Sequence, residues 1–331
     1  MSDVLIGIVI ALTAFFSTLF LTKAWIKISK KSGLTGKDMN KRNGQEIAES
    51  GGMTFILGAS FAILFYIFFK TFVFQTASNI VEALALLSTI FMAGLIGFVD
   101  DILGWKKGLK QWQKPLLTIP IAIPLMSLKI GYSIINVPFI GAIDLGIIFP
   151  LLFVPVGIVG AANGFNMLAG YNGLEAGMGA IILTTLALLS LVNGNIWLFL
   201  LSISSVAALL GFLVYNKYPA KVFPGDTLTY SVGALIATVA ILGNLEKASL
   251  FLFLPYFLTF VLKARGRFKP ESFARVNSDG SLSMPYKKIY DVTHLSIFLL
   301  SKVKRKVYEK DILKLILGTE VILALVALLI F

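Results

Sequence analysis

Long runs of apolar residues alternate with short polar segments along almost the whole chain. A membrane helix needs about 20 mostly apolar residues, and about ten stretches here reach that length. They lie near residues 3–22, 52–75, 80–98, 114–130, 144–161, 174–192, 194–215, 227–244, 248–263 and 312–331. The fourth and fifth contain prolines, which membrane helices tolerate where neighbours satisfy the freed carbonyls. The pattern predicts an all-α, polytopic integral membrane protein with about ten transmembrane helices.

Composition agrees with this interpretation. Of the 331 residues, 57% are hydrophobic and only 14% are charged, whereas about a quarter of a soluble domain is charged. The chain has no cysteine, which excludes disulfides and thiolate chemistry. The first apolar segment is too long for a signal peptide and begins with Asp3 rather than a basic residue, so we expect a retained helix.

The net charge of +12 is concentrated in the loops after the first, third, seventh and ninth apolar stretches. The positive-inside rule places these loops in the cytoplasm and both termini outside. Basic loops also attract anionic lipids, and we expect a bilayer rather than a nucleic acid as their partner. Unusual acids, asparagines and glycines gather in the loops on this same face, which include a long one at about 264–311.

The first polar cluster is the adjacent pair Asp100 and Asp101, which ends the third apolar stretch. Negative charge at a helix C-terminus opposes the helix dipole, and two neighbouring carboxylates repel each other unless a cation compensates. A solubilising helix end is the plain alternative. The unfavourable placement indicates a functional role instead.

Two further clusters follow later membrane stretches. Residues 163–177 are rich in asparagine and glycine, and a turn between helices would need fewer such residues. Asp226 lies where the eighth stretch begins, where helix capping is the simpler role. The side-chain oxygens of Asn166 and Asp226 suit Mg²⁺, which takes one or two protein ligands and completes its shell with phosphate and water.

Together the three clusters predict a pocket at the cytoplasmic membrane surface with metal ligands, carboxylates and many cations. Phosphoryl transfer needs these groups, because it depends on positioning and on neutralising charge. A site at the membrane surface implies that one substrate is a lipid. Residues 1–331 then form a single transmembrane catalytic domain.

The motifs resemble those of the polyprenyl-phosphate N-acetylhexosamine-1-phosphate transferases, and most of all the archaeal and eukaryotic dolichyl-phosphate branch. The resemblance covers residues 33–295, approximately. It rests on four segments in a fixed order, which are Leu34-Thr-Gly-Lys-Asp-Met-Asn-Lys41 with Ile47-Ala-Glu-Ser50, Gly97-Phe-Val-Asp-Asp101, Asn166-Met-Leu-Ala-Gly-Tyr-Asn-Gly-Leu-Glu-Ala-Gly177 and Val222-Phe-Pro-Gly-Asp-Thr227.

The resemblance implies roles for individual residues. Asn166 and Asp226 would hold Mg²⁺, with Mn²⁺ as the alternative ion. Asp100, Asp101 and Lys110 would be catalytic, with Asp100 the base toward the lipid phosphate. The residues implied in substrate binding are Met39, Glu49, Gly170, Asn172, Glu175, Phe223, Arg267 and Arg275.

The long loop departs from the family pattern. The eukaryotic members of the family carry an Arg/His-rich motif there that contacts the pyrophosphate and the sugar, whereas residues 265–277 contain no histidine. Arg265, Arg267 and Arg275 are the candidates to replace it. His294, the only histidine in the chain, lies outside that motif, and we interpret it as structural.

We therefore expect a Mg²⁺-dependent phosphotransferase that moves N-acetylglucosamine-1-phosphate, or a related sugar-1-phosphate, from a UDP-sugar to a polyprenyl or dolichyl phosphate. UMP and a lipid-diphosphate-sugar would be the products, as in the first membrane step of a lipid-linked glycan pathway of the N-glycosylation type. Direct attack and an aspartyl-phosphate route both stay open. The oligomeric state is open as well, with a homodimer as the alternative to a monomer.

Two other classes of function compete with this one. A transporter or flippase of an anionic lipid or nucleotide-sugar would also use membrane acids and a basic mouth, but it needs polar residues through to the outer face. A structural scaffold would not need the asparagine and glycine clusters.

Overall fold

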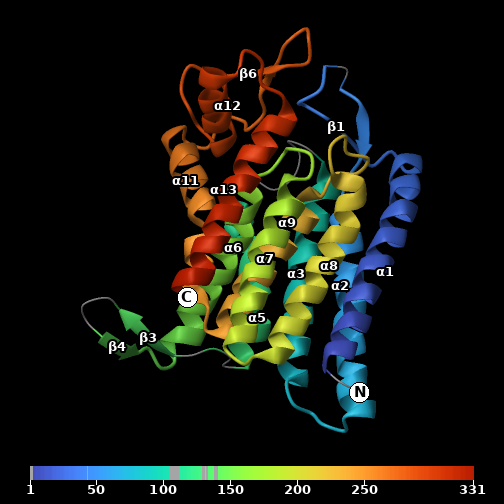
Figure 1. The fold of residues 1–331 in the computed structure, drawn as a ribbon, viewed down its shortest axis with the longest axis vertical. Helices are drawn as coiled ribbons and strands as arrows, with labels where there is room; N and C mark the ends of the chain where they lie inside the picture. Colours follow the sequence, from blue (N-terminus) through green and yellow to red (C-terminus); the bar gives the residue numbers. More distant parts are fainter. Residues whose placement is uncertain (1–2, 43, 105–111, 129–130, 132, 138–140) are drawn as a thin grey trace.

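The computed structural model describes residues 3–42, 44–104, 112–128, 131, 133–137 and 141–331, and the statements below concern these residues. Long helices run side by side along the long axis of the molecule (Figure 1). The chain begins at the lower end in that view, and small hairpins and loops crown the upper end. The all-α membrane fold expected from the sequence is confirmed.

The helices follow the apolar stretches closely. In chain order they are α1 (Asp3–Lys31), α2 (Gly52–Phe68), η1 (Phe69–Val73), α3 (Ile80–Leu103), α4 (Gln113–Thr118), η2 (Ile119–Ala122), α5 (Ile123–Ser127), η3 (Phe149–Phe153), α6 (Val154–Met167), α7 (Leu174–Val192), α8 (Ile196–Asn216), α9 (Gly225–Gly243), α10 (Glu246–Leu252), α11 (Leu254–Arg265), α12 (Val292–Val303) and α13 (Glu309–Ile330).

The expected count of ten spans is not confirmed. Eight helices are long and apolar enough to cross a membrane in the described part of the chain, or nine if the pair α10 and α11, bent by 56°, forms one span. The fourth predicted span is broken into α4, η2 and α5. Pro115, Pro120 and Pro124 punctuate these short pieces, because each proline lacks the N–H that would continue an α-helix.

Three antiparallel hairpins complete the secondary structure. Their strands are β1 (Thr35–Lys37) with β2 (Glu46–Ala48), β3 (Ile134–Val137) with β4 (Gly141–Asp144), and β5 (Arg275–Val276) with β6 (Leu282–Ser283). The hairpin β3–β4 lies at the opposite end from the other two (Figure 1).

Helix α9 is the centre of the bundle. Every residue from Thr227 to Gly243 is buried, and the helix packs against α2, α3, α6 and α7. The buried hydroxyl of Thr238 is satisfied within the helix, because its Oγ1 donates to the Ala234 carbonyl at 2.8 Å. A central helix of small and apolar residues allows its neighbours to approach closely. At the first turn of α9, this close approach brings α3 into contact with the backbone of Asp226 and Thr227.

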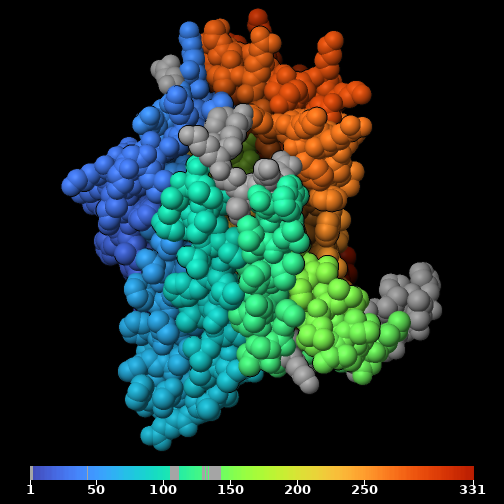
Figure 2. Space-filling model, turned by 180° about the vertical axis from the view of Figure 1, so that it is seen from behind, coloured from blue at the N-terminus to red at the C-terminus, as the bar shows by residue number. Residues whose placement is uncertain are grey.

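One end of the bundle, here called the polar end, carries the hairpins β1–β2 and β5–β6 together with α12 (Figure 1). Of the basic loops recognised in the sequence, those after the first, seventh and ninth stretches lie here. The lysines of the loop after the third stretch lie outside the described residues. The segment after β2 runs beside the segment before α9, because Phe223 N donates to Ala48 O at 2.7 Å and Gly51 N donates to Phe223 O at 2.9 Å. The surface is hollowed at this end, between the teal region around α3 and the orange region around α11 (Figure 2).

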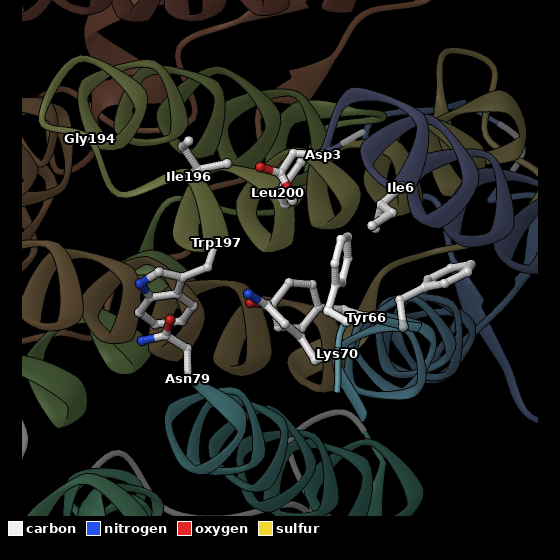
Figure 3. Close-up of a pocket in the computed structure, with 11 residues that line it drawn as sticks. Asp3, Ile6, Tyr66, Lys70, Asn79, Gly194, Ile196, Trp197 and Leu200 are labelled. Carbon is white, nitrogen blue, oxygen red and sulfur yellow. The ribbon is translucent and has the colours of Figure 1, made fainter. Parts of the chain in front are cut away.

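A separate cavity of about 250 Å³ lies at the other end of the bundle. Figure 3 shows Trp197 and Asn79 on one side of it and the ends of Tyr66 and Lys70 pointing toward them. None of the residues implied in catalysis or substrate binding lines this cavity. The predicted site must therefore be sought at the polar end.

Replacing Gly97 by alanine is expected to separate α3 from α9. A Cβ at this position would lie 2.6 Å from Thr227 N and close to the Asp226 carbonyl, both of which are backbone groups that cannot swing aside. Overpacking typically costs about 1–3 kcal/mol, so the unfolding temperature in detergent should fall.

Gly160→Ala is the matched control for that measurement. Gly160 lies in α6, and an added Cβ there meets nothing within 4 Å. Alanine favours the helix by about 1 kcal/mol over glycine, so this variant should keep or raise the unfolding temperature. Equal unfolding temperatures of Gly97→Ala and Gly160→Ala would contradict the close packing of α3 on α9.

Candidate functional site

Lys114 joins two of the predicted acids at the polar end. Its Nζ lies 2.7 Å from Asp100 Oδ2 and 2.6 Å from Asp226 Oδ2. Asp100 comes from the last turn of α3, Asp226 from the first turn of α9 and Lys114 from the start of α4. Because the ammonium lies between the two carboxylates, it offsets their repulsion in a poorly hydrated place.

Sequence reasoning missed Lys114. It assigned the basic role near the acid pair to Lys110, which lies outside the residues that the structure describes. A signal was present, since Lys114 stands alone at the mouth of the fourth apolar stretch, directly before Pro115. A single cation at the start of a membrane segment reads equally well as a topology marker, so the sequence did not single it out.

Asp101 plays a different part from its neighbour. Its carboxylate accepts hydrogen bonds from Asp226 N at 2.7 Å, from Thr227 N at 3.2 Å and from Thr227 Oγ1 at 2.6 Å. The residue at the cap position of α9, Pro224, makes no side-chain cap, so Asp101 caps this helix from α3. A carboxylate at a helix N-terminus is favoured by the helix dipole.

The capping role considered for Asp226 is therefore filled by Asp101. Asp226 directs its carboxylate at Lys114 instead. Gly225 has a positive φ of 68°, and a side chain there would collide with the Asp101 carboxylate. Glycine is needed at this turn because it tolerates both constraints.

Asn166 lies beside the first turns of α9, the helix on which Asp226 stands. The hydroxyl of Thr229, one turn after Asp226 on α9, lies 3.1 Å from Asn166 Oδ1 and 3.2 Å from the Asp226 carbonyl oxygen. The described residues contain no group of three or more histidine, cysteine or acidic side chains that would enclose a metal. One carboxylate and one carboxamide oxygen fit an ion that keeps most of its shell for phosphate and water.

Asn172 sits in a buried network rather than facing a cavity. Its Nδ2 donates to Asp38 Oδ2 at 3.0 Å and to Glu309 Oε1 at 2.5 Å, and its Oδ1 accepts from Ala220 N at 3.0 Å. The backbone N–H of Asn172 also donates to Glu309 Oε1, at 2.8 Å. The loop between α6 and α7 is thus tied to three other segments of the polar end.

Gly170 and Glu175 belong to the same loop. Glu175 is buried, and its Oε1 accepts from Gly170 N at 2.7 Å. The Gly170 carbonyl accepts from Asn40 Nδ2 at 3.0 Å. A side chain at Gly170 would come within 3.0 Å of the Phe273 ring, and the φ of 103° also favours glycine. Glu175 therefore supports the loop from inside.

Glu49 and Phe223 lie side by side over Gly36. A Cβ on Gly36 would collide with the Glu49 carboxylate and would lie 3.4 Å from the Phe223 ring. Burial, followed by the charges of Asp101, Asp226 and Glu175, raises the pKa of Glu49 to about 8. Met39, also implied in this region, is 38% exposed at the surface.

The two arginines of the long loop stand apart from the carboxylates. Arg267 and Arg275 are both exposed, and neither shares an ion pair with Asp100 or Asp226 in the described part of the chain. His294 is buried in α12, where its Nδ1 accepts from Tyr290 N at 3.4 Å. Burial lowers the pKa of His294, which agrees with the structural role expected for it.

Comparisons with known proteins agree with these motifs. The sequence profile described as glycosyl transferase family 4 matches residues 83–244, which include the Asp100–Asp101 pair and Asp226. A Sulfolobus acidocaldarius protein, provisionally named UDP-N-acetylglucosamine–dolichyl-phosphate N-acetylglucosaminephosphotransferase, is 36% identical over 98% of this chain and 96% of its own length.

More distant relatives include both branches named by the resemblance. The Dictyostelium discoideum UDP-N-acetylglucosamine–dolichyl-phosphate N-acetylglucosaminephosphotransferase is 29% identical over 71% of this chain and 65% of its own length. The phospho-N-acetylmuramoyl-pentapeptide-transferase of Streptococcus thermophilus is 31% identical over 76% of each chain. The resemblance drawn from the motifs is confirmed, and the chain belongs to glycosyl transferase family 4.

Proposed function

We propose that this protein transfers N-acetylglucosamine-1-phosphate from UDP-N-acetylglucosamine to a polyprenyl or dolichyl phosphate. The observation that carries the proposal is the ion-paired cluster of Asp100, Lys114 and Asp226 at one end of a membrane bundle. The names of the relatives support the same chemistry and favour an enzyme over a transporter. The polar end then faces the cytoplasm, as the basic loops suggest.

In the proposed reaction an oxygen of the lipid phosphate attacks the β-phosphorus of the UDP-sugar. The bond from this phosphorus to the bridging oxygen breaks, and UMP leaves with that electron pair. Asp100 takes the proton of the lipid phosphate where one is present, or orients the dianion. Lys114 offers an ammonium beside Asp100 and Asp226, which suits contact with a phosphate oxygen.

Mg²⁺ is the proposed metal, with Mn²⁺ as the alternative, and Asp226 and Asn166 are the residues that would hold it. When bound, such an ion would act as a Lewis acid and neutralise charge that develops on the phosphate groups. Asp101 supports this arrangement indirectly, because its three hydrogen bonds fix the first turn of α9 on which Asp226 stands.

The nucleoside would bind next to the loop between α6 and α7. Phe223 is half-buried and would stack against the uracil ring, with Glu49 beside it. Met39, which is exposed, would complete the nucleoside pocket. Asn172 has both side-chain hydrogens engaged by carboxylates, so it would shape this surface more than contact the base. Arg267 and Arg275 are exposed enough to meet a sugar or pyrophosphate that enters from the cytoplasm.

A direct assay tests the proposal. Purified protein in detergent, given UDP-N-acetylglucosamine and dolichyl phosphate, should release UMP with Mg²⁺ and stop with a chelator. Asp100→Asn should lower the rate at least about a hundredfold, the lower range for loss of a general base. Asp3→Asn, at the far end of the molecule, is the control and should keep wild-type turnover.

Lys114→Met should also abolish most turnover. The variant leaves the buried Asp100 and the partly exposed Asp226 without the cation between them, which should lower both stability and activity. Lys114→Arg keeps the charge but not the compact ammonium, and should recover stability better than activity. Thermal unfolding and UMP release, measured on both variants, separate the two effects. If Lys114→Met kept wild-type turnover, Lys114 would not belong to the catalytic site.

The stability of the folded protein should depend on pH through Glu49, and the direction of this dependence follows from its raised pKa. Because its pKa in the folded protein is about 8, against an ordinary value of 4.5, the folded state holds a proton that the unfolded chain releases between these values. Its contribution to stability is therefore complete below about pH 4.5 and is lost as the pH rises toward 8. In metal-free buffer, Glu49→Gln should flatten the fall in unfolding temperature across this window. An unchanged slope would contradict the assignment.

A further inference from the structure

The first residue of α13 reaches back to the loop between α6 and α7. Glu309 is only 4% exposed, although it begins a helix at the protein surface. It lies beyond the motif-bearing region of the sequence and beyond the stretch matched by the family profile. The carboxylate nevertheless contacts two segments that carry residues implied in nucleotide binding.

Glu309 uses both of its carboxylate oxygens. Oε1 accepts from the backbone N–H of Asn172 at 2.8 Å and from Asn172 Nδ2 at 2.5 Å. Oε2 pairs with the ammonium of Lys41. One side chain therefore connects the loop between α6 and α7 with the hairpin connection after β1, where Met39 lies.

Lys41 balances the charge of this cluster. Its Nζ also lies 3.6 Å from Asp38 Oδ2, and Asp38 is the second acceptor of Asn172 Nδ2. The ammonium stands 4.2 Å from the centre of the Tyr218 ring, which belongs to the loop before α9. Two buried carboxylates and one cation are stable together only when each hydrogen bond is made, so the cluster specifies one arrangement of its loops.

We propose that Glu309 is a positioning residue for the nucleotide, and that it sets the affinity for the UDP moiety by fixing the loop between α6 and α7. The inference rests on the function proposed above and deepens it. The carboxylate does not touch the reacting phosphates. It holds Asn172 and Lys41, and through them the surface formed by Gly170, Met39 and their neighbours.

The separation of binding from chemistry makes the idea testable. The cluster at Asp100, Lys114 and Asp226 contains none of the contacts of Glu309. A loosened loop should therefore raise the KM for the UDP-sugar and leave kcat and the KM for the lipid phosphate nearly unchanged. General destabilisation of α13 would lower all activity together and would not produce this split.

Glu309→Gln is the variant of choice, because it keeps the shape and one acceptor oxygen but cannot pair with Lys41. Loss of a charged hydrogen bond should raise the KM for UDP-N-acetylglucosamine about tenfold or more, with kcat within about twofold. Binding of UMP, measured directly by calorimetry, should weaken by the same factor. Glu309→Asp, which restores the charge on a shorter side chain, should recover part of the affinity.

Glu320→Gln is the matched control. Glu320 belongs to the same helix and is fully buried, but neither of its carboxylate oxygens has a hydrogen-bond partner in the described structure. Replacing this carboxyl group should leave the KM for the UDP-sugar and the affinity for UMP at wild-type values. If Glu309→Gln cannot be purified, Lys41→Met tests the same cluster and should show the same rise in KM.

The outcomes distinguish this inference from the proposed function. If the wild type releases no UMP from any UDP-sugar but binds UMP, and Glu309→Gln binds it about tenfold more weakly, the proposed reaction fails and the positioning role stands. Unchanged affinity in Glu309→Gln would overturn the positioning role, as would an equal loss in Glu320→Gln. Failure of the wild type to bind UMP would overturn it as well.

Discussion

The contact on which the polar end depends is the placement of the Lys114 ammonium between Asp100 and Asp226. Three helices must end or begin at one point for these atoms to meet, namely α3, α4 and α9. Close packing of α3 on α9 at Gly97 brings the acids together, and the cation makes their proximity tolerable. Asp101 adds a second tie, because it caps α9 from α3. The proposed catalytic geometry and the packing of α3 on α9 therefore depend on the same few contacts.

The membrane character and the positions of most helices could be predicted because each depends on local sequence. A run of apolar residues long enough to cross the bilayer must form a helix to satisfy its own backbone, and α7 occupies the 19 residues expected for it. The fourth span could not be predicted in the same way. Its prolines break the hydrogen-bond ladder, and only the packing of α4, η2 and α5 decides whether the pieces form one continuous helix.

The site shows where prediction from sequence reaches its limit. Asp100, Asn166 and Asp226 were identified because each stands at the end of an apolar stretch beside glycines, and the structure does bring them to one end. The sequence did not show that Asp100 pairs with Lys114 while Asp101 caps α9. Adjacent residues of a helix point about 100° apart, so the neighbouring helices determine what each side chain contacts. Lys114 and Glu309 were missed for a related reason, because their partners are distant in the chain.

Two polar clusters thus lie at the same end of the molecule, and they differ in how far they are exposed to solvent. The carboxylates around Lys114 present charge toward a surface where phosphates could gather, and Lys114 itself remains partly exposed. The cluster of Asp38, Lys41, Asn172 and Glu309 turns its hydrogen bonds inward, and Asn172 is only 3% exposed. A buried polar network is costly unless it is fully satisfied, and when it is satisfied it favours one conformation. Under the proposed function, the second cluster would keep the nucleotide-binding loop in one position beside the carboxylates that face the phosphates.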